Sequence, residues 1–124
     1  MKKIVKFTWA EFDEAVDSLA RRIHKEAYDQ IYGVPRGGLV LAVALSHRLD
    51  IPLALSVPIE LKKRQRTLIV DEISDTGQTL RYLCGKDAIC AVIHLKELAT
   101  WVPCTWVQMV EKNVWIEYPW EKQS

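Results

Sequence analysis

The feature that most constrains the fold is the stretch 68–80, which changes abruptly from apolar to acidic to small polar residues. The apolar run from Leu68 to Val70 predicts a buried parallel strand. The strand is expected to end on two carboxylates, Asp71 and Glu72, after which a loop of small polar residues begins at Ser74. From Leu80 onward the chain has helical character, so the stretch predicts a strand, a loop and a helix in immediate succession.

This loop has the features of a phosphate cradle. Gln78 and Thr79 are expected near a helix N-terminus, where free backbone N–H groups and the positive end of the helix dipole attract anions. Thr76 and Thr79 add hydroxyl donors, and Gly77 lets the backbone approach an anion closely. Carboxylates beside such a cradle suit a polyol, or a Mg²⁺ ion that accompanies further phosphates. The stretch therefore predicts a sugar phosphate with additional anionic groups as the ligand.

A second glycine-rich turn, at residues 33–38, precedes a helix expected over about 39–49. Its N–H groups and the guanidinium of Arg36 can receive an anion, although an ordinary strand–helix turn explains the pattern equally well. The glycine spacing does not fit Gly-x-Gly-x-x-Gly, and the 68–80 stretch is not a Walker A loop. The motifs thus argue against a dinucleotide fold and a P-loop.

Helix and strand signals alternate along the rest of the chain, which predicts an α/β protein. Thr8 and Glu11 form a capping-box pattern ahead of a helix with one apolar face. With 124 residues, the chain is expected to form one domain over 1–124. Further strands are expected at 29–34, 52–57, 88–94 and 105–110.

Charge and cysteine content exclude several classes of protein. The net charge of +1 gives no overall attraction to nucleic acid, and no window approaches the length of a membrane span. Charged residues interrupt any apolar run at the N-terminus, so no signal peptide is expected there. The three cysteines lack metal-ligand spacing, which favours reduced, mostly buried thiols in a cytoplasmic protein.

Three other features have both a structural and a functional interpretation. Four basic residues within 62–66 suggest either a solvated turn or a focus of charge that attracts a polyphosphate. Lys96 is expected just beyond a strand, where it would face a ligand crevice or lie on the surface. Trp115 could stack on a planar base or anchor a core. His94 is assigned no role.

The 68–80 stretch resembles the signature with which type I phosphoribosyltransferases bind 5-phosphoribosyl-1-diphosphate (PRPP): three apolar residues, two acids, a spacer, then Asp-Thr-Gly-x-Thr. The order of the other features is similar to that in bacterial xanthine-guanine phosphoribosyltransferases and related archaeal purine enzymes, over nearly the whole chain. The resemblance implies the type I phosphoribosyltransferase fold. This is a mostly parallel sheet flanked by helices, with a small C-terminal hood, here contributed mainly by about 96–124.

The resemblance also implies a reaction, a cofactor and a set of site residues. A cytoplasmic homo-oligomer, dimer or tetramer, would use Mg²⁺ to transfer the phosphoribosyl group from PRPP to guanine, xanthine or hypoxanthine, releasing pyrophosphate. Asp75 would be the catalytic acid or base, and Asp71 and Glu72 would hold the ribose hydroxyls and the metal. The remaining implied contacts are Ser74, Asp75, Thr76, Gly77, Gln78 and Thr79 for PRPP, Arg36 and Gly37 for pyrophosphate, and Lys96, Trp115 and Ile116 for the base.

One departure from the family keeps other functions open. The family carries a long flexible loop over the reacting centre, whereas only 58–66 is available here and is expected to form a turn. Ribosyl transfer needs protection from water and positioning of pyrophosphate. A non-catalytic module that binds PRPP or a purine nucleotide and regulates a partner is therefore the alternative. The cluster 62–66 alone would support an RNA-binding regulator, whereas the pair of Lys96 and Trp115 favours the enzyme.

Overall fold

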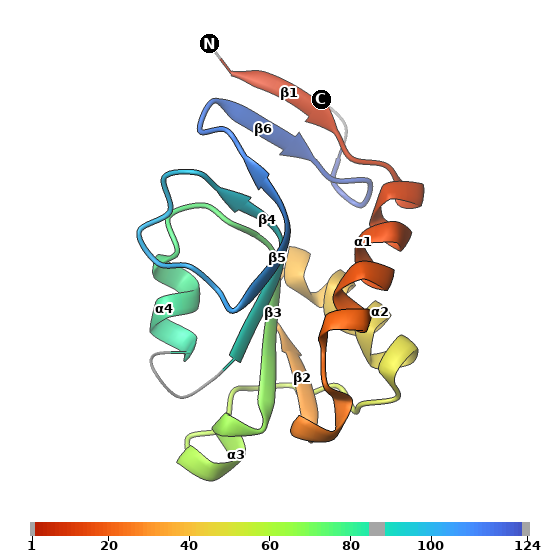
Figure 1. The fold of residues 1–124 in the computed structure, drawn as a ribbon, viewed down its shortest axis with the longest axis vertical. Coiled ribbons are helices and arrows are strands. Elements are labelled where there is room, and N and C mark those ends of the chain that lie inside the picture. Colours follow the sequence, from red (N-terminus) through yellow and green to blue (C-terminus); the bar gives the residue numbers. More distant parts are fainter. Residues whose placement is uncertain (1, 85–88, 123–124) are drawn as a thin grey trace.

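The computed structural model describes residues 2–84 and 89–122, in which two parallel sheets are flanked by helices (Figure 1). The four-stranded sheet has the order β2-β3-β4-β5, and the two-stranded sheet pairs β1 with β6. This confirms the predicted α/β class. The strands are β1 (Lys3–Lys6), β2 (Gln30–Gly33), β3 (Thr67–Ser74), β4 (Ile89–Lys96), β5 (Thr105–Val110) and β6 (Val114–Glu117).

The helices cover both faces of the larger sheet (Figure 1). Alternate residues of β3 face opposite sides: Leu68 and Val70 join a core cluster with α1 and α2, while Ile69 joins a second cluster with α4. A central parallel strand must bury both faces, which explains its continuous apolar run. The helices are α1 (Trp9–Arg22), α2 (Gly37–Leu49), α3 (Leu61–Gln65) and α4 (Gln78–Cys84), with a 3₁₀ turn at Lys25–Ala27.

The predicted capping box at the start of α1 is confirmed. The Glu11 N–H donates to Thr8 Oγ1 at 3.1 Å, and the Thr8 N–H donates to Glu11 Oε1 at 3.0 Å. The helix buries Phe12, Val16 and Leu19 along one face, as its periodicity predicts. None of the helices in the described ranges is long and apolar enough to cross a membrane.

Several predicted boundaries are corrected. The strand β3 does not end on the acid pair but continues to Ser74, because Asp71 and Ser74 still pair with Val92 and Leu95 of β4. The helix α2 starts at Gly37, two residues earlier than expected. The predicted strand 88–94 corresponds to β4, which continues to Lys96, while residue 88 lies outside the described residues.

The predicted strand at 52–57 is wrong, because it touches the sheet edge at only one point. The Ile31 N–H donates to the Pro52 carbonyl at 2.9 Å, and the Ala54 N–H donates to the Ile31 carbonyl at 2.7 Å. These bonds form a single parallel bridge between Ile31 and Leu53. The chain then leaves the sheet, and Leu55 is 94% exposed.

The prediction of reduced thiols is also corrected. Cys84 at the end of α4 and Cys90 in β4 form a disulfide, with Cα atoms 6.9 Å apart. Both cysteines are buried, as expected, whereas Cys104 is a free thiol in an exposed position. Helix and strand bring Cys84 and Cys90 together on one core cluster, which sequence spacing alone did not indicate.

The small sheet contains a strand that the sequence analysis did not assign. The strand β1 pairs with β6, so that Ile4 lies opposite Trp115 and Val5 opposite Ile116. After β6, the ring of Trp120 packs edge-on against Phe12 of α1 at 5.3 Å between centroids. The part of the predicted hood from β6 to Trp120 therefore packs against β1 and α1, in the N-terminal part of the chain (Figure 1).

Candidate functional site

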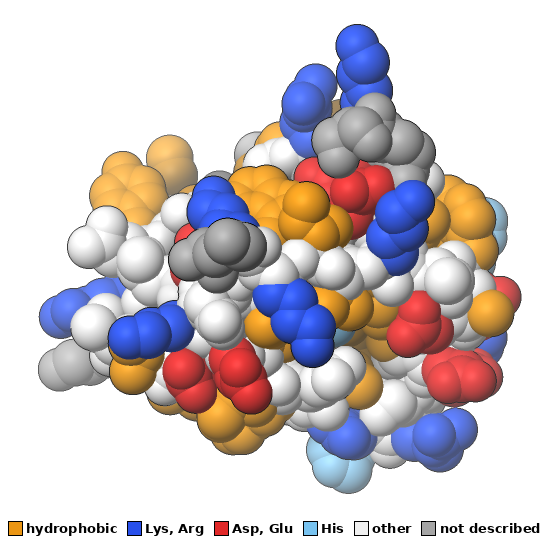
Figure 2. All heavy atoms as spheres, turned by 90° about the horizontal axis from the view of Figure 1, so that it is seen from above, with side chains coloured by type: hydrophobic (Ala, Val, Ile, Leu, Met, Phe, Trp, Pro, Cys, Tyr) orange, Lys and Arg blue, Asp and Glu red, His pale blue; other side chains and the backbone are white. Residues whose placement is uncertain are grey.

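Three cavities meet at Glu72, near the carboxyl ends of β3 and β4. Their volumes are about 210, 200 and 730 Å³, and Glu72 lines all three. Seen from the hood end, this face carries acidic, basic and hydrophobic side chains close together (Figure 2). Ligands of open α/β sheets bind at such carboxyl ends.

The cavity of about 210 Å³ is formed by the predicted phosphate loop. It is lined by residues between Asp71 and Leu80, including every predicted PRPP contact except Gln78. Gly77 has a φ of +91°, which favours glycine, and a Cβ there would lie 2.5 Å from the Trp101 carbonyl oxygen. The buried hydroxyl of Ser74 has no hydrogen-bond partner in the described chain. A buried polar group without a partner suits a ligand that supplies one.

The acid pair lies at the junction of the cavities. Asp71 is only 9% exposed, and its Oδ1 accepts the Glu72 N–H at 2.9 Å. Burial, reinforced by the neighbouring Glu72 carboxylate, raises the pKa of Asp71 far above its ordinary value. Asp71 therefore tends to keep its proton, and a bound cation would favour the loss of that proton.

The second glycine-rich turn approaches the acid pair directly. An added Cβ at Gly37 would lie 1.0 Å from Glu72 Oε2, so no larger residue fits there while Glu72 keeps this position. Gly37 and Arg36 line the cavity of about 730 Å³. The peptide bond between Pro35 and Arg36 is cis. The structure thus brings both predicted pyrophosphate residues beside the predicted ribose residues.

This larger cavity also includes residues that the sequence analysis missed. Trp120, Glu121 and Lys122 line it opposite the turn. The carboxylate of Glu121 accepts the Tyr118 N–H at 2.8 Å, which closes a turn in the tail. Lys122 adds a second cationic residue to the lining, and nothing in its sequence context indicated this position.

The cavity of about 200 Å³ collects all three predicted base-binding residues, Lys96, Trp115 and Ile116, together with Asp75. Trp115 is 50% exposed, so it is not a core anchor. The Lys2 ammonium lies 4.5 Å from the centroid of the Trp115 ring. Since Lys2 does not line this cavity, one face of the indole can hold the cation while the other faces a planar ligand.

The ammonium of Lys96 is already engaged by the turn between β5 and β6. It donates to the carbonyls of Glu111 at 3.4 Å and Lys112 at 3.3 Å, and also to that of Val114. Since an ammonium has three donors, these bonds use its whole capacity. Lys96 therefore ties β4 to the hood, and an incoming acceptor must replace one of these carbonyls.

Two further residues, His94 and Tyr118, lie next to the site and contact the main chain of Glu72 through Tyr118. The Tyr118 hydroxyl lies 2.8 Å from His94 Nδ1 and 3.3 Å from the Glu72 carbonyl oxygen, to which it can donate. Burial lowers the pKa of His94 to about 4, which keeps it neutral, and raises the pKa of Tyr118. The signal for this network was a histidine inside an apolar strand, because a buried polar group needs a partner.

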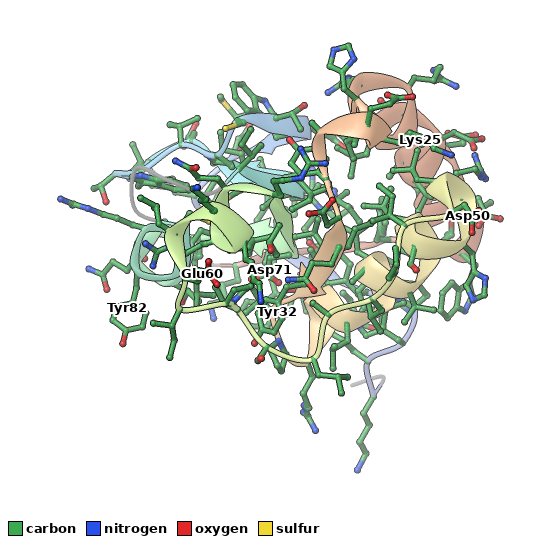
Figure 3. All side chains as sticks on the ribbon, turned by 90° about the horizontal axis from the view of Figure 1, so that it is seen from below. Lys25, Tyr32, Asp50, Glu60, Asp71 and Tyr82 are labelled. Carbon is green, nitrogen blue, oxygen red and sulfur yellow. A yellow bond between two sulfur atoms is a disulfide. The ribbon has the colours of Figure 1, made fainter. Side chains whose placement is uncertain are left out.

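The basic cluster lies at the other end of the sheet. The segment 58–66 contains α3, which immediately precedes β3, whereas the acid pair lies toward the end of that strand (Figure 1). Thr67 and Asp71 are four residues apart along β3, which corresponds to roughly 13 Å. Seen from this end, Glu60, which directly precedes α3, lies in front of the sheet (Figure 3). The segment forms a short helix rather than the expected turn, and as placed it neither covers the site nor lines its cavities.

Comparison with known proteins identifies the family. No family model matches the chain. A purine phosphoribosyltransferase structure from Pyrococcus horikoshii is 34% identical, covers 98% of this chain and 96% of its own, and superimposes with a TM-score of 0.78. A Helicobacter pylori xanthine-guanine-hypoxanthine phosphoribosyltransferase structure, 18% identical, shares the fold over 97% of this chain and 93% of its own, with a TM-score of 0.80.

Curated relatives of similar sequence are phosphoribosyltransferases as well. The xanthine-guanine phosphoribosyltransferase of Nitratidesulfovibrio vulgaris is 26% identical over 142 residues, which cover 98% of this chain and 87% of the relative. That of Idiomarina loihiensis is 28% identical over 136 residues, 92% of this chain and 84% of the relative. Given the 34% identical relative that matches almost throughout, the chain belongs to the purine phosphoribosyltransferase family and has the type I phosphoribosyltransferase fold.

Proposed function

We propose that the protein, as a cytoplasmic homo-oligomer, transfers the 5-phosphoribosyl group of PRPP to a 6-oxopurine, namely guanine, xanthine or hypoxanthine, and releases pyrophosphate. The observation that carries this proposal is the position of Glu72, which borders all three cavities. A phosphate, a diphosphate and a planar base could thus bind around one pair of carboxylates. That is the geometry that a reaction between PRPP and a base requires.

The 5′-phosphate of PRPP would bind in the loop cavity. The unpartnered Ser74 hydroxyl supports this assignment, since it could donate a hydrogen bond to a phosphate oxygen. The remaining donors would come from Thr76, Gly77, Gln78 and Thr79. Arg36 and Gly37 would hold the pyrophosphate, where a guanidinium can form paired hydrogen bonds with phosphate oxygens.

The acid pair would hold the ribose hydroxyls and help to retain Mg²⁺. Carboxylate oxygens are ligands that Mg²⁺ prefers, and the raised pKa of Asp71 beside Glu72 indicates a position where a positive charge would be favourable. Within residues 2–84 and 89–122, no group of three or more His, Cys, Asp or Glu side chains could hold a metal. The fit is therefore to an ion bound partly by PRPP oxygens, and when bound it would neutralise charge on the departing pyrophosphate.

The base would lie between Trp115 and the end of β4. An ammonium offers donors only, so Lys96 would favour an oxo group at C6 over the amino group of adenine. The main chain at Ile116 would meet the substituent at C2. As the bond from C1′ to pyrophosphate breaks and the bond from C1′ to N9 forms, Asp75 would take the proton from N7 and stabilise positive charge on the ribose. Asp75 borders both the base and phosphate cavities.

A non-catalytic PRPP or nucleotide sensor is the alternative, and the position of α3 favours it. The segment 58–66, which takes the place of the family's long loop, does not line any of the three cavities, so water has access unless a partner subunit covers the site. An RNA-binding regulator has less support. Lys63 and Arg66 of the basic cluster pair with Glu60 at 3.7 Å and Asp29 at 2.9 Å, as in an ordinary solvated surface.

The test is pyrophosphate release from PRPP and Mg²⁺ with guanine, xanthine, hypoxanthine or adenine, assayed separately. Turnover with a 6-oxopurine but not adenine would support the enzyme and rank the bases. An Asp75→Ala variant is the control for contaminating activity. PRPP binding by calorimetry without turnover would support the sensor, and the absence of both would contradict either function.

A further inference from the structure

We propose that Thr100 is a positioning residue for PRPP. It would act through the main chain of the loop 74–79, by orienting a backbone N–H group toward the 5′-phosphate. This inference deepens the proposed function and rests on it. Thr100 lies outside the PRPP motif, in the loop 97–104 that joins β4 to β5. Its N–H and its hydroxyl both donate to the carbonyl oxygen of Thr76, at 2.9 and 3.0 Å.

The two hydrogen bonds orient the peptide between Thr76 and Gly77. In a trans peptide the carbonyl and the following N–H point in opposite directions. Because Thr100 holds the Thr76 carbonyl, the Gly77 N–H points away from the loop 97–104. The cavity of the phosphate loop lies on that side, since its lining comes only from residues between Asp71 and Leu80. Thr100 thus aims a donor at the place where a phosphate would bind.

The neighbouring residue Trp101 supports Gly77 from the same side. A Cβ on Gly77 would lie 2.5 Å from the Trp101 carbonyl oxygen and 2.9 Å from its Cβ, so the two backbones are in close contact. The Trp101 side chain packs against the core cluster that contains Leu80 and Leu95. The loop 97–104 is therefore anchored to the core and can hold the phosphate loop in one conformation.

The same loop begins at the base subsite. The Ala99 N–H donates to the Lys96 carbonyl at 3.1 Å, which forms a turn directly after the residue assigned to the purine 6-oxo group. Only this short turn separates Lys96 from Thr100. A few consecutive residues thus connect the base cavity to the phosphate cavity. The hydroxyl of Thr100 contacts only the phosphate loop, through the Thr76 carbonyl.

If the Gly77 N–H group is already oriented before the ligand binds, binding loses less conformational entropy. Without the Thr100 hydroxyl, the Thr76 carbonyl keeps only one of its two bonds to this residue, and the peptide can rotate. We therefore expect weaker binding of ligands that carry a 5′-phosphate. Affinity for the base should not change, because Lys96, Trp115 and Ile116 keep their contacts.

The experiment compares the wild type with Thr100→Val, which keeps the shape but removes the hydroxyl, and Thr100→Ser, which restores it. Thr105→Val is the matched control, since it makes the same change outside the site. Binding of PRPP and of ribose 5-phosphate is measured by calorimetry with Mg²⁺, alongside the KM for the base and the melting temperature. For Thr100→Val we expect both dissociation constants to rise about three- to tenfold, as the loss of one hydrogen bond implies, with an unchanged KM for the base.

Thr100→Ser and Thr105→Val should bind like the wild type. Equal binding by Thr100→Val, or a loss that serine does not restore, would overturn the role of Thr100 and leave the proposed function intact. A parallel rise in the KM for the base would indicate general damage to the site and also overturn it. Failure of the wild type to bind either ligand would overturn the proposed function, and this inference with it.

Discussion

The two ends of the larger sheet differ in how their ionisable side chains are buried and paired. At the carboxyl end, Asp71 is buried with a raised pKa, and the Lys96 ammonium is saturated by backbone carbonyls. At the other end, Arg66 forms an exposed pair with Asp29 and lowers the pKa of that carboxyl. Exposed pairs contribute little to stability, whereas burying a carboxylate is costly. The buried acid at the carboxyl end therefore costs stability in the ligand-free protein, as is expected where a ligand would bind.

The largest expected effect at the ligand-binding end is on catalysis. Asp75→Asn should lower kcat by about a hundredfold or more, the usual contribution of a general acid or base, and weaken PRPP binding much less than that. Pyrophosphate release measures kcat and calorimetry measures PRPP binding. Glu60→Gln, at the other end of the sheet, is the matched control. Activity within tenfold of the wild type in Asp75→Asn would remove Asp75 from the chemistry.

The second effect concerns the base and the hood together. Lys96→Met should raise the KM for the base more than tenfold and lower the free energy of unfolding by about 2 kcal/mol, because bonds from a charged donor to three carbonyls are lost. Steady-state kinetics and denaturant titration measure the two changes. Lys112→Met keeps the carbonyl that Lys96 contacts and should leave both unchanged. A stable Lys96→Met variant would show that the carbonyl contacts do not hold the hood.

The third effect has the opposite sign, since Asp71→Asn should stabilise the ligand-free protein. The folded carboxyl keeps its proton up to about pH 9, whereas the unfolded one loses it near pH 4. The unfolded state thus binds fewer protons in this window, and stability falls as the pH rises. At pH 7 the variant should melt higher by roughly 3–6 °C, the shift expected for about 1 kcal/mol.

The pH dependence of the melting temperature between pH 7 and 9, without Mg²⁺, tests this assignment. His94 does not interfere in that window, because its folded pKa of about 4 lies below its unfolded value, and its contribution is lost only as the pH falls below about 6.5. The slope should flatten in Asp71→Asn. An unchanged slope would mean that Asp71 is not the titrating group. PRPP binding should weaken in the same variant.

The smallest effects are expected at the far end. Lys63→Gln and Arg66→Gln should each change the free energy of unfolding very little, as is typical of exposed ion pairs, and leave turnover unaltered. Denaturant titration and the pyrophosphate assay provide both values. Loss of RNA binding in these variants, with a steep salt dependence in the wild type, would instead restore the regulatory interpretation of the basic cluster.

Local sequence signals predicted those elements that are determined by their own residues, such as a capping pattern or an apolar run. The capping box of Thr8 and Glu11 located α1, the apolar run before Asp71 located β3, and β5 has the bounds predicted for it. The same stretches indicated which residues would gather at the carboxyl ends. Their assigned chemical roles stay predictions, because proximity alone does not show which atoms meet a substrate.

Elements that depend on distant partners were not predictable in this way. The strand β1 is short, and Ile4 and Val5 are flanked by lysines, so its pairing with β6 leaves no local signal. The segment 52–57 has strand-like residues but meets Ile31 at one point only. Tyr118 and His94 became a pair only when the tail folded over β4. Tertiary contacts decided each of these cases.

The pairing of β1 with β6 also affects the order in which the protein is completed during synthesis. The ribosome makes Lys3 near the beginning of the chain and its partner Val114 near the end. Strand β1 therefore stays unpaired until β6 has left the exit tunnel of the ribosome. Closing so long a loop is slow, since chain entropy opposes it until the contact forms. The four-stranded sheet can thus begin to form before the two-stranded sheet, which is complete only after β6 has been made.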